Sequence, residues 1–454
     1  MSGKTGGREA TEGVIPGRYC LSVGMPDLPA PEGWQWRPLL DLARLESGHT
    51  PSRKKPEYWG GDVPWIGIKD ATGNNGATLD DTMQHTNDLG IENSAARILA
   101  ENTVCLSRTA SVGYVVVMGR PMATSQDFAN WVCGPDLDHR FLKYVLLLEN
   151  EALHRFSHGS THKTIYYPEL KAFHICLPPI EEQQRIAECL EILDRKITVN
   201  EAAAETLTAL AKTVFSSWFV KFDPVWANIE GREMDHVSPE TQELFPSGFG
   251  DDGLPAGWTE RGLDEIATFL NGAALQKYPA IDQEDSIPVI KIAELRSGVT
   301  KKTGRASPNV PEKFHIQAGD ILFSWSGTLM QTIWTGEDGA LNQHLFKVSS
   351  TNAPRWFHFY AVEHHMDEFR AIAASKATTM GHIQRHHLAD AKIAWPPEQL
   401  LSKADHILKP IFDGYCNKLI QCEDLRKTRD ALLPELLSGR ISPRHTCADA
   451  READ

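Results

Sequence analysis

The sequence lacks long apolar runs, and this absence limits where the chain can work. None of its 454 residues lies in an uninterrupted stretch of 18 or more apolar residues, so no transmembrane helix is expected. The first 30 residues are rich in Gly and Pro and contain no apolar core of a secretory signal. The eight cysteines form no C-x-x-C pair, which argues against a zinc site or a disulfide framework. We therefore expect a cytoplasmic protein.

Familiar catalytic motifs are missing as well. The sequence has no P-loop, no dinucleotide-binding glycine motif, no G-x-S-x-G nucleophile elbow, no H-E-x-x-H zinc motif and no amino-methyltransferase signature. Asp136, Glu169 and Lys171 loosely resemble the carboxylates and lysine of a nuclease that binds a divalent metal. The second half of the chain has no counterpart of this set. We therefore expect no catalytic residue and no metal site, and keep a two-lobed nuclease as an alternative.

Charge is distributed unevenly along the chain. The 46 basic and 60 acidic residues give a net charge of −14, which by itself argues against a nucleic-acid binder. Residues 223–260, however, contain nine acids and one base, Arg232, and supply −8 of that total. Basic residues gather at positions 53–55 and between positions 291 and 305. Local patches decide where a polyanion binds, so the total charge does not exclude DNA.

The chain contains an internal repeat. Five segments of the first half return in the same order in the second half, shifted by 217 to 224 residues, which indicates a duplication. The matched segments are 33–34 with 257–258, 64–70 with 288–294, 106–109 with 323–326, 123–126 with 340–343, and 161–179 with 379–397. Each half begins with short apolar runs separated by Gly, Pro, Asn and Asp, a pattern typical of a mainly β domain. A Pro-Pro pair and a long helical pattern follow.

The two helical patterns carry heptad seams. Apolar residues alternate steps of four and three along both segments, as in a coiled coil, and the polar residues Asn200 and Lys418 interrupt the two seams at the same repeat position. We expect two β-rich domains of an α+β fold, each followed by a long helix, with the two helices paired with each other as a coiled coil. The principal seam positions are Ile186, Leu190, Leu193, Ile197, Asn200, Leu207, Leu408, Ile411, Lys418 and Leu425.

The predicted boundaries follow from the repeat and the charge pattern. They are an N-terminal tail at 1–29, a first domain at 30–178, a first helix at 179–222, an acidic linker at 223–253, a second domain at 254–396, a second helix at 397–441 and a C-terminal tail at 442–454.

Loops of both domains combine basic, hydroxyl and aromatic residues, which is a composition suited to phosphates and base edges. The candidate DNA-binding residues are Arg53, Lys54, Lys55, Tyr58, Lys69, Arg108, Thr109, His162 and Lys163 in the first domain, and Lys277, Lys291, Lys301, Lys302, Arg305, Trp325, Gln384 and Arg385 in the second.

The whole plan resembles the specificity subunit of type I restriction-modification systems. The resemblance is carried by HTPSRKKPEYWGGDVPWIGIKD at 49–70, LSRTASVG at 106–113, the GST…LPPIEEQQRI segment within 159–197, WFVKFDPV at 218–225 and LPELLSGRI at 433–441. It implies that each β-rich domain is a target-recognition domain that reads one half of a split DNA sequence. It also implies that the helices pair antiparallel, set the spacing of the halves and dock the partner subunits.

The same resemblance assigns the chemistry to those partners. Two modification subunits would carry S-adenosylmethionine and methylate adenine, restriction subunits would use ATP and Mg, and this chain would bind no cofactor and catalyse nothing. Besides the nuclease, a fused restriction enzyme and a coiled-coil scaffold without a DNA role stay open as alternatives.

Overall fold

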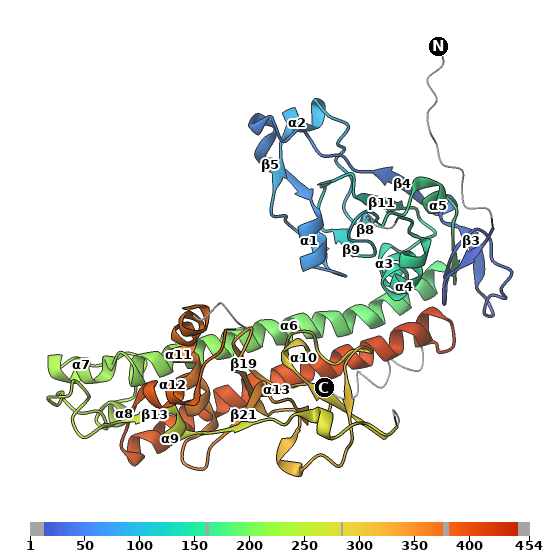
Figure 1. Ribbon diagram of the computed structural model, residues 1–454. Coiled ribbons are helices and arrows are strands. Elements are labelled where there is room, and N and C mark those ends of the chain that lie inside the picture. Colours follow the sequence, from blue (N-terminus) through green and yellow to red (C-terminus); the bar gives the residue numbers. More distant parts are fainter. Residues whose placement is uncertain (1–12, 160–162, 283–284, 376–380, 444–454) are drawn as a thin grey trace. The chain divides into compact units, whose positions relative to one another are not determined.

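The structure is a computed structural model that describes residues 13–159, 163–282, 285–375 and 381–443. The chain forms two compact units (Figure 1). The first contains the residues up to Asp194 and those from Lys427 onward, and the second runs from Arg195 to Arg426. The two long helices have 40 residues each: α6 (Ile180–Phe219) and α13 (Glu398–Leu437). Each helix is divided between the two units. No helix in the described ranges is both long and apolar enough to span a membrane.

Three sheets build the first unit. Their strands, in spatial order, are β4 (Ala43–Ser47), β11 (Phe128–Cys133), β8 (Val104–Ser107), β9 (Val115–Met118) and β6 (Thr78–Leu79) in one; β10 (Ala123–Thr124), β5 (Trp59–Ile66) and β7 (His85–Thr86) in another; and β1 (Ile15–Pro16), β2 (Leu21–Val23), β12 (Phe173–Leu177) and β3 (Gln35–Pro38) in the third. Every residue of β8 and β9 is buried, as expected for strands covered on both faces.

Short helices surround these sheets. They are η1 (Leu39–Asp41), η2 (Pro56–Tyr58), α1 (Ile68–Gly73), α2 (Asp88–Glu92), α3 (His139–Leu148), α4 (Asn150–Phe156) and α5 (Tyr167–Lys171). Helix α3 joins the sheets to α6, because the Tyr144 hydroxyl donates to Asp194 at 2.6 Å and Arg140 pairs with Glu191 at 3.2 Å. Arg429 of α13 completes this polar cluster at 2.8 Å from Asp194.

The second unit repeats the strand plan of the first. Its strands, in spatial order, are β14 (Thr268–Asn271), β21 (Leu345–Ser349), β18 (Ile321–Ser324) and β19 (Met330–Ile333); β16 (Arg305–Ala306), β15 (Ile287–Ile290), β20 (Gly339–Leu341) and β17 (His315–Ile316); and β13 (Thr259–Gly262) with β22 (Lys392–Trp395). The order β14-β21-β18-β19 matches β4-β11-β8-β9, and β15 pairs with β20 in parallel as β5 does with β10. The duplication expected from the sequence is confirmed.

The helices of the second unit pack around a large aromatic core. Besides the long helices they are α7 (Asp223–Glu230), α8 (Pro239–Gln242), α9 (Leu263–Ile266), η3 (Leu275–Lys277), α10 (Ile292–Ser297), η4 (Glu312–Phe314), α11 (Arg355–Ser375) and α12 (Arg385–Asp390). Phe215 and Phe219 of α6 contact Phe357 of α11 with ring centroids 5.6 and 5.3 Å apart. Aromatic pairs in this range add to the free energy gained by burial.

Two segments are more ordered than the sequence indicated. Residues 15–23, predicted as part of a tail, form β1 and β2, where Leu21 and Val23 are buried and Glu149 accepts the backbone N–H groups of Tyr19 and Cys20 at 2.6 and 2.8 Å. The acidic segment 223–253 folds onto the second unit, where Phe245 is buried. The ring centroids of Phe245 and Trp218 lie 5.3 Å apart. In the first segment, β2 is buried by pairing with β12, and in the acidic segment a few apolar residues are buried among many polar ones.

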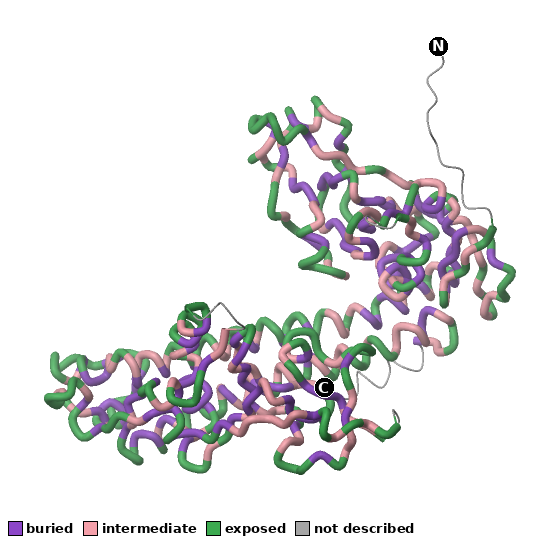
Figure 2. The backbone as a smooth tube through the Cα atoms, in the orientation of Figure 1, coloured by how far each residue is buried: buried purple, intermediate pink, exposed green. Residues whose placement is uncertain are grey.

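The predicted antiparallel pairing of the helices is confirmed within the second unit, where α6 and α13 run side by side (Figure 1). The Cys422 thiol contacts the Ile197 carbonyl oxygen, and the Lys418 ammonium donates to the Asn200 amide oxygen at 3.0 Å, so numbers rise along one helix as they fall along the other. Buried, half-buried and exposed positions alternate along both helices (Figure 2), and all ten principal seam positions are buried or half-buried.

The contact between Asn200 and Lys418 gives a stability prediction. Replacing Asn200 by Leu removes the acceptor that holds the half-buried ammonium, and we expect it to cost about 1 kcal/mol or somewhat more in urea unfolding. Replacing both residues by Leu removes donor and acceptor together and restores stability to at least the wild-type value. A single substitution without effect on unfolding would show that the pair contributes nothing to the seam.

His358 of α11 gives a pH prediction. Its ring is 1% exposed, and burial lowers the pKa to about 4 despite the opposing pull of the Pro354 backbone. Because the folded pKa lies below the unfolded value of about 6.5, this histidine stabilises the fold fully above pH 6.5 and progressively less toward pH 4. We expect the wild-type protein to lose on the order of 2 kcal/mol of its free energy of unfolding, measured with urea, between pH 7.5 and 5 because of this histidine. His358→Leu should remove this loss. An unchanged pH dependence in the variant would contradict this assignment.

Candidate nucleic-acid interface

A concave site of about 520 Å³ lies where several loops of the first unit meet. It is lined mainly by polar and charged residues from segments that are distant in the sequence, and two of the predicted residues, Arg53 and Lys69, take part. The lining consists of Thr50, Arg53, Trp65, Gly67, Ile68, Lys69, Asp70, Met83, Gln84, Ser125, Gln126 and Asp127.

Hydrogen bonds between the loops hold this site in shape. The loop after β4 is fixed by the His49 N–H, which donates to the Thr124 carbonyl at 2.9 Å, and by the Trp65 indole, which donates to the His49 carbonyl at 3.1 Å. The Thr50 hydroxyl donates to the Gln126 amide oxygen at 2.6 Å. Gln126 therefore links the loop after β4 to the loop at 123–126, which the repeat matches with the second unit.

Arg108 and Lys163 lie next to this site. The Arg108 guanidinium donates to the Gln126 carbonyl at 2.9 Å and lies over the Tyr167 ring at 4.9 Å. Thr109 forms a β-bridge with Thr164, and the Ala110 N–H donates to the Lys163 carbonyl at 3.0 Å. Arg108 thus fixes the loop beside the site while its own side chain stays half-buried.

The remaining predicted residues of the first unit differ in accessibility. Lys54 and Lys55 are exposed on the same loop as Arg53, and Lys69 is exposed on α1. Tyr58 is 6% exposed, and its hydroxyl accepts a hydrogen bond from the Lys55 ammonium at 2.9 Å, so its ring belongs to the core of the loop. His162 lies outside the described residues.

The second unit brings matched positions together in the same way. Trp325 corresponds to Arg108 in the repeat, and its carbonyl accepts the Ile383 N–H at 3.0 Å as the Arg108 carbonyl accepts Ile165 at 2.8 Å. Ser326 and His382 form the β-bridge that Thr109 and Thr164 form in the first unit. The backbone frame is therefore the same in both units.

The side chains on this shared frame are different. The Trp325 indole donates to the Asn271 amide oxygen at 3.2 Å, and its ring lies 5.8 Å from His344 and 6.3 Å from His382. Gln343 occupies the position of Gln126. An aromatic and amide-rich cluster thus stands where the first unit has an arginine and a carboxylate.

The predicted residues of the second unit outside this cluster are mostly exposed. Lys277, Lys291, Gln384 and Arg385 are exposed on their segments. Lys301, Lys302 and Arg305 follow α10, close to Lys291. The Arg305 guanidinium donates twice to Ser286, at 3.1 and 2.6 Å, and so braces the start of β15.

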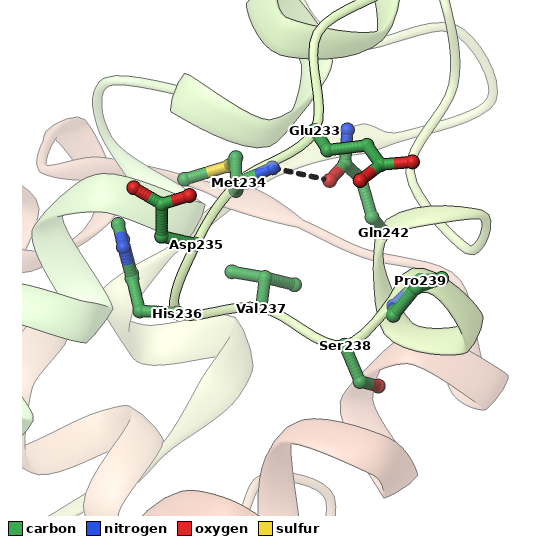
Figure 3. A pocket seen from close by; sticks show the side chains of 8 residues that line it. All are labelled: Glu233, Met234, Asp235, His236, Val237, Ser238, Pro239 and Gln242. Atoms are coloured by element: carbon green, nitrogen blue, oxygen red, sulfur yellow. Dashed lines mark hydrogen bonds between the residues drawn. The ribbon is translucent and has the colours of Figure 1, made fainter.

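Another concave region, of about 500 Å³, lies in the acidic segment between α7 and α8 (Figure 3). Glu233, Asp235 and His236 are among its lining residues, and the Met234 N–H donates to the Gln242 amide oxygen at 3.0 Å. Its two carboxylates would repel a phosphate backbone, so this region is a poor candidate for DNA contact. Within the described ranges no group of three or more His, Cys, Asp and Glu side chains is arranged to hold a metal ion.

Sequence reasoning missed several residues that shape these sites. Gln84 lines the first site although it is 31 residues away from Arg53, and no spacing rule joins the two. Asn271 contacts Trp325 across 54 residues. The sequence did indicate Gln126, because the repeat matches it with Gln343. The repeat alone does not show that the Gln126 side chain bridges two loops.

Comparisons with known proteins match the duplicated organisation of the chain. The family model described as type I restriction modification DNA specificity domain matches residues 31–209 and again residues 255–421. The chain is 26% identical over 423 residues to the type I restriction enzyme MjaIX specificity subunit of Methanocaldococcus jannaschii, covering 90% of this chain and 94% of that protein. It is 24% identical to the HindI specificity subunit of Haemophilus influenzae, over 66% of this chain and 76% of the relative.

A solved structure shares the fold. The S subunit of a type I restriction-modification system from M. genitalium matches with a TM-score of 0.51 at 16% sequence identity, over 89% of this chain and 96% of that one.

The exposed lysines of the second unit give a prediction on DNA affinity. We expect Lys302→Ala to weaken binding to any duplex about equally and to lower the slope of log affinity against log salt by about 1, because one phosphate contact and its released counterion are lost. Lys392→Ala is the matched control, since Lys392 lies on β22 and faces Glu265 at 3.9 Å. Equal salt slopes for wild type and Lys302→Ala would place Lys302 outside the interface.

Proposed function

Because the chain belongs to the family of type I restriction-modification DNA specificity proteins, we propose that it recognises a DNA target in two parts, one for each unit. It is a non-catalytic specificity subunit, and catalysis belongs to other subunits of such systems. The observation that carries the proposal is the duplicated frame with different side chains at matched positions, Arg108 against Trp325 and Asp127 against His344. A common frame presents each set to DNA in the same manner, while different donors and acceptors select different bases.

The partner subunits are part of the same proposal. We infer that two modification subunits dock on the long helices and methylate adenine, and that restriction subunits join them. Val199 and Leu210 of α6 support this docking, since they are apolar and 62% and 49% exposed on the second unit's helix pair. An apolar stripe of this kind suits a partner helix. S-adenosylmethionine, ATP and Mg would be bound by those partners.

A reducing compartment suits this role. Seven of the eight cysteines lie in the described part of the chain, and all seven are free thiols. Six of those seven thiols are buried, and burial raises the pKa of Cys105 and Cys176, which keeps these thiols protonated and unreactive. Free thiols are typical of cytoplasmic proteins. We propose that the chain works in the cytoplasm, where it meets the DNA of its host.

Exchange of one recognition unit tests the two-part readout. Residues 13–178, which include β1 and β2, are replaced by the equivalent segment of another family member, and the methylated motif is read in a host that supplies the modification partner. We expect one half of the motif to change and the other half to stay. The matched exchange of residues 254–396 should change the opposite half. A change in both halves after either exchange would refute independent readout.

A further inference from the structure

Arg53 is held more rigidly than its exposure indicates. Its guanidinium lies 4.6 Å from the ring centre of Trp59 and 5.1 Å from that of Trp65. The two indoles pack edge to face, with centroids 5.2 Å apart, and Trp65 is 4% exposed. Gln84 accepts a hydrogen bond from the Arg53 Nη2 at 2.9 Å. Two aromatic contacts and one hydrogen bond therefore fix the plane of an exposed guanidinium.

The fixed plane leaves most donors of this side chain available. A guanidinium has five N–H donors in a rigid fork, and within the described residues Gln84 is its one hydrogen-bond acceptor. Such a fork matches two acceptors side by side. In the major groove of DNA, guanine presents two acceptors, O6 and N7, and arginine is their commonest partner. A phosphate group offers paired acceptors as well.

The surroundings favour a base edge over a phosphate. The concave site that contains Arg53 and Lys69 also contains the carboxylates of Asp70 and Asp127, so its formal charges cancel. A phosphate would gain little in such a site, whereas the mixture of amide, hydroxyl and charged groups there suits the donors and acceptors of a base pair. Lys54 is exposed next to Arg53 in the sequence and is not among the residues that line this site, so it is better placed for a phosphate.

The second unit does not repeat this arrangement. The shift of 224 residues places Lys277 at the position of Arg53 and the buried Val289 at the position of Trp65. Lysine lacks the planar fork of arginine, and valine offers no aromatic face for a cation. The arginine held between two indoles is therefore a feature of the first unit.

We propose that Arg53 is a specificity-determining residue that reads a guanine in the half-site bound by the first unit. The proposal rests on the proposed function, because it requires that the first unit binds one half of a two-part DNA target. It goes further by naming the base, the residue and the atoms, with two N–H groups of Arg53 donating to guanine O6 and N7.

The test uses the complete complex of this chain with its modification subunits. The methylated motif is first determined for the wild type, and the half read by the first unit is identified by exchange of residues 13–178. Duplexes are then made with guanine or 7-deazaguanine, which lacks the N7 acceptor, at each G·C pair of that half. Binding is measured for the wild type, Arg53→Lys, Arg53→Ala and the neighbouring control Lys54→Ala.

We expect one G·C pair at which 7-deazaguanine weakens wild-type binding about 10-fold or more. Arg53→Ala should lose roughly 10- to 100-fold in discrimination at that pair and be insensitive to 7-deazaguanine there, and Arg53→Lys should lose part of both, because an ammonium lacks the planar fork. Lys54→Ala should weaken binding to all duplexes alike and keep the wild-type motif. Arg53→Lys keeps the positive charge beside the indoles, so it decides the question even if Arg53→Ala lowers the melting temperature.

Other outcomes overturn the inference. If the first half contains no G·C pair, or if the Arg53 variants keep the full motif and their response to 7-deazaguanine, Arg53 does not read guanine. A uniform loss of affinity equal to that of Lys54→Ala would assign Arg53 to a phosphate instead. If the wild-type complex methylates no two-part motif, the proposed function fails together with this inference.

Discussion

The fold depends on the register of two antiparallel helices. Asn200 and Lys418 are counterparts in the sequence repeat, and they face each other in the helix pair at 3.0 Å. Two given residues of an antiparallel helix pair can face each other in one register only. The contact between Asn200 and Lys418 therefore fixes which residues oppose each other along the seam. A polar contact in an apolar seam costs stability but disfavours shifted registers, which would separate the Lys418 ammonium from the Asn200 amide oxygen. The register places Arg429 beside Asp194 in the first unit and brings Cys422 to Ile197 in the second.

Duplication of a stable frame, followed by divergence of its loops, can produce a two-part recognition protein without changing the core that stabilises each unit. The strand order, the parallel strand pair and the bridge beside β8 or β18 recur in both units, so the burial that stabilises one also stabilises the other. The loops between these strands carry little of that burial and can vary. Arg108 over the Tyr167 ring in the first unit and its counterpart Trp325 beside two histidines in the second illustrate how far the side chains have diverged.

The sequence predicted the features that depend on periodicity and repetition. The helices predicted at 179–222 and 397–441 are observed at Ile180–Phe219 and Glu398–Leu437, because heptad spacing and Pro-Pro starts are local signals. Strands β1 and β2 were missed because their few apolar residues are buried through a contact with Glu149, far along the chain. The side-chain partners in the interface were missed for the same reason, since the Gln84 acceptor of Arg53 is brought near by the fold and by no local pattern.

Sequencing of methylated bases in a host with and without this gene tests the central claim most directly, provided that the modification partner is present in both strains. Independent reading by two units predicts a methylated motif of two short specific parts separated by a spacer of fixed length, and this motif should vanish when the gene is removed. A single contiguous motif, or the same methylation pattern in both strains, would contradict two-part recognition by this chain.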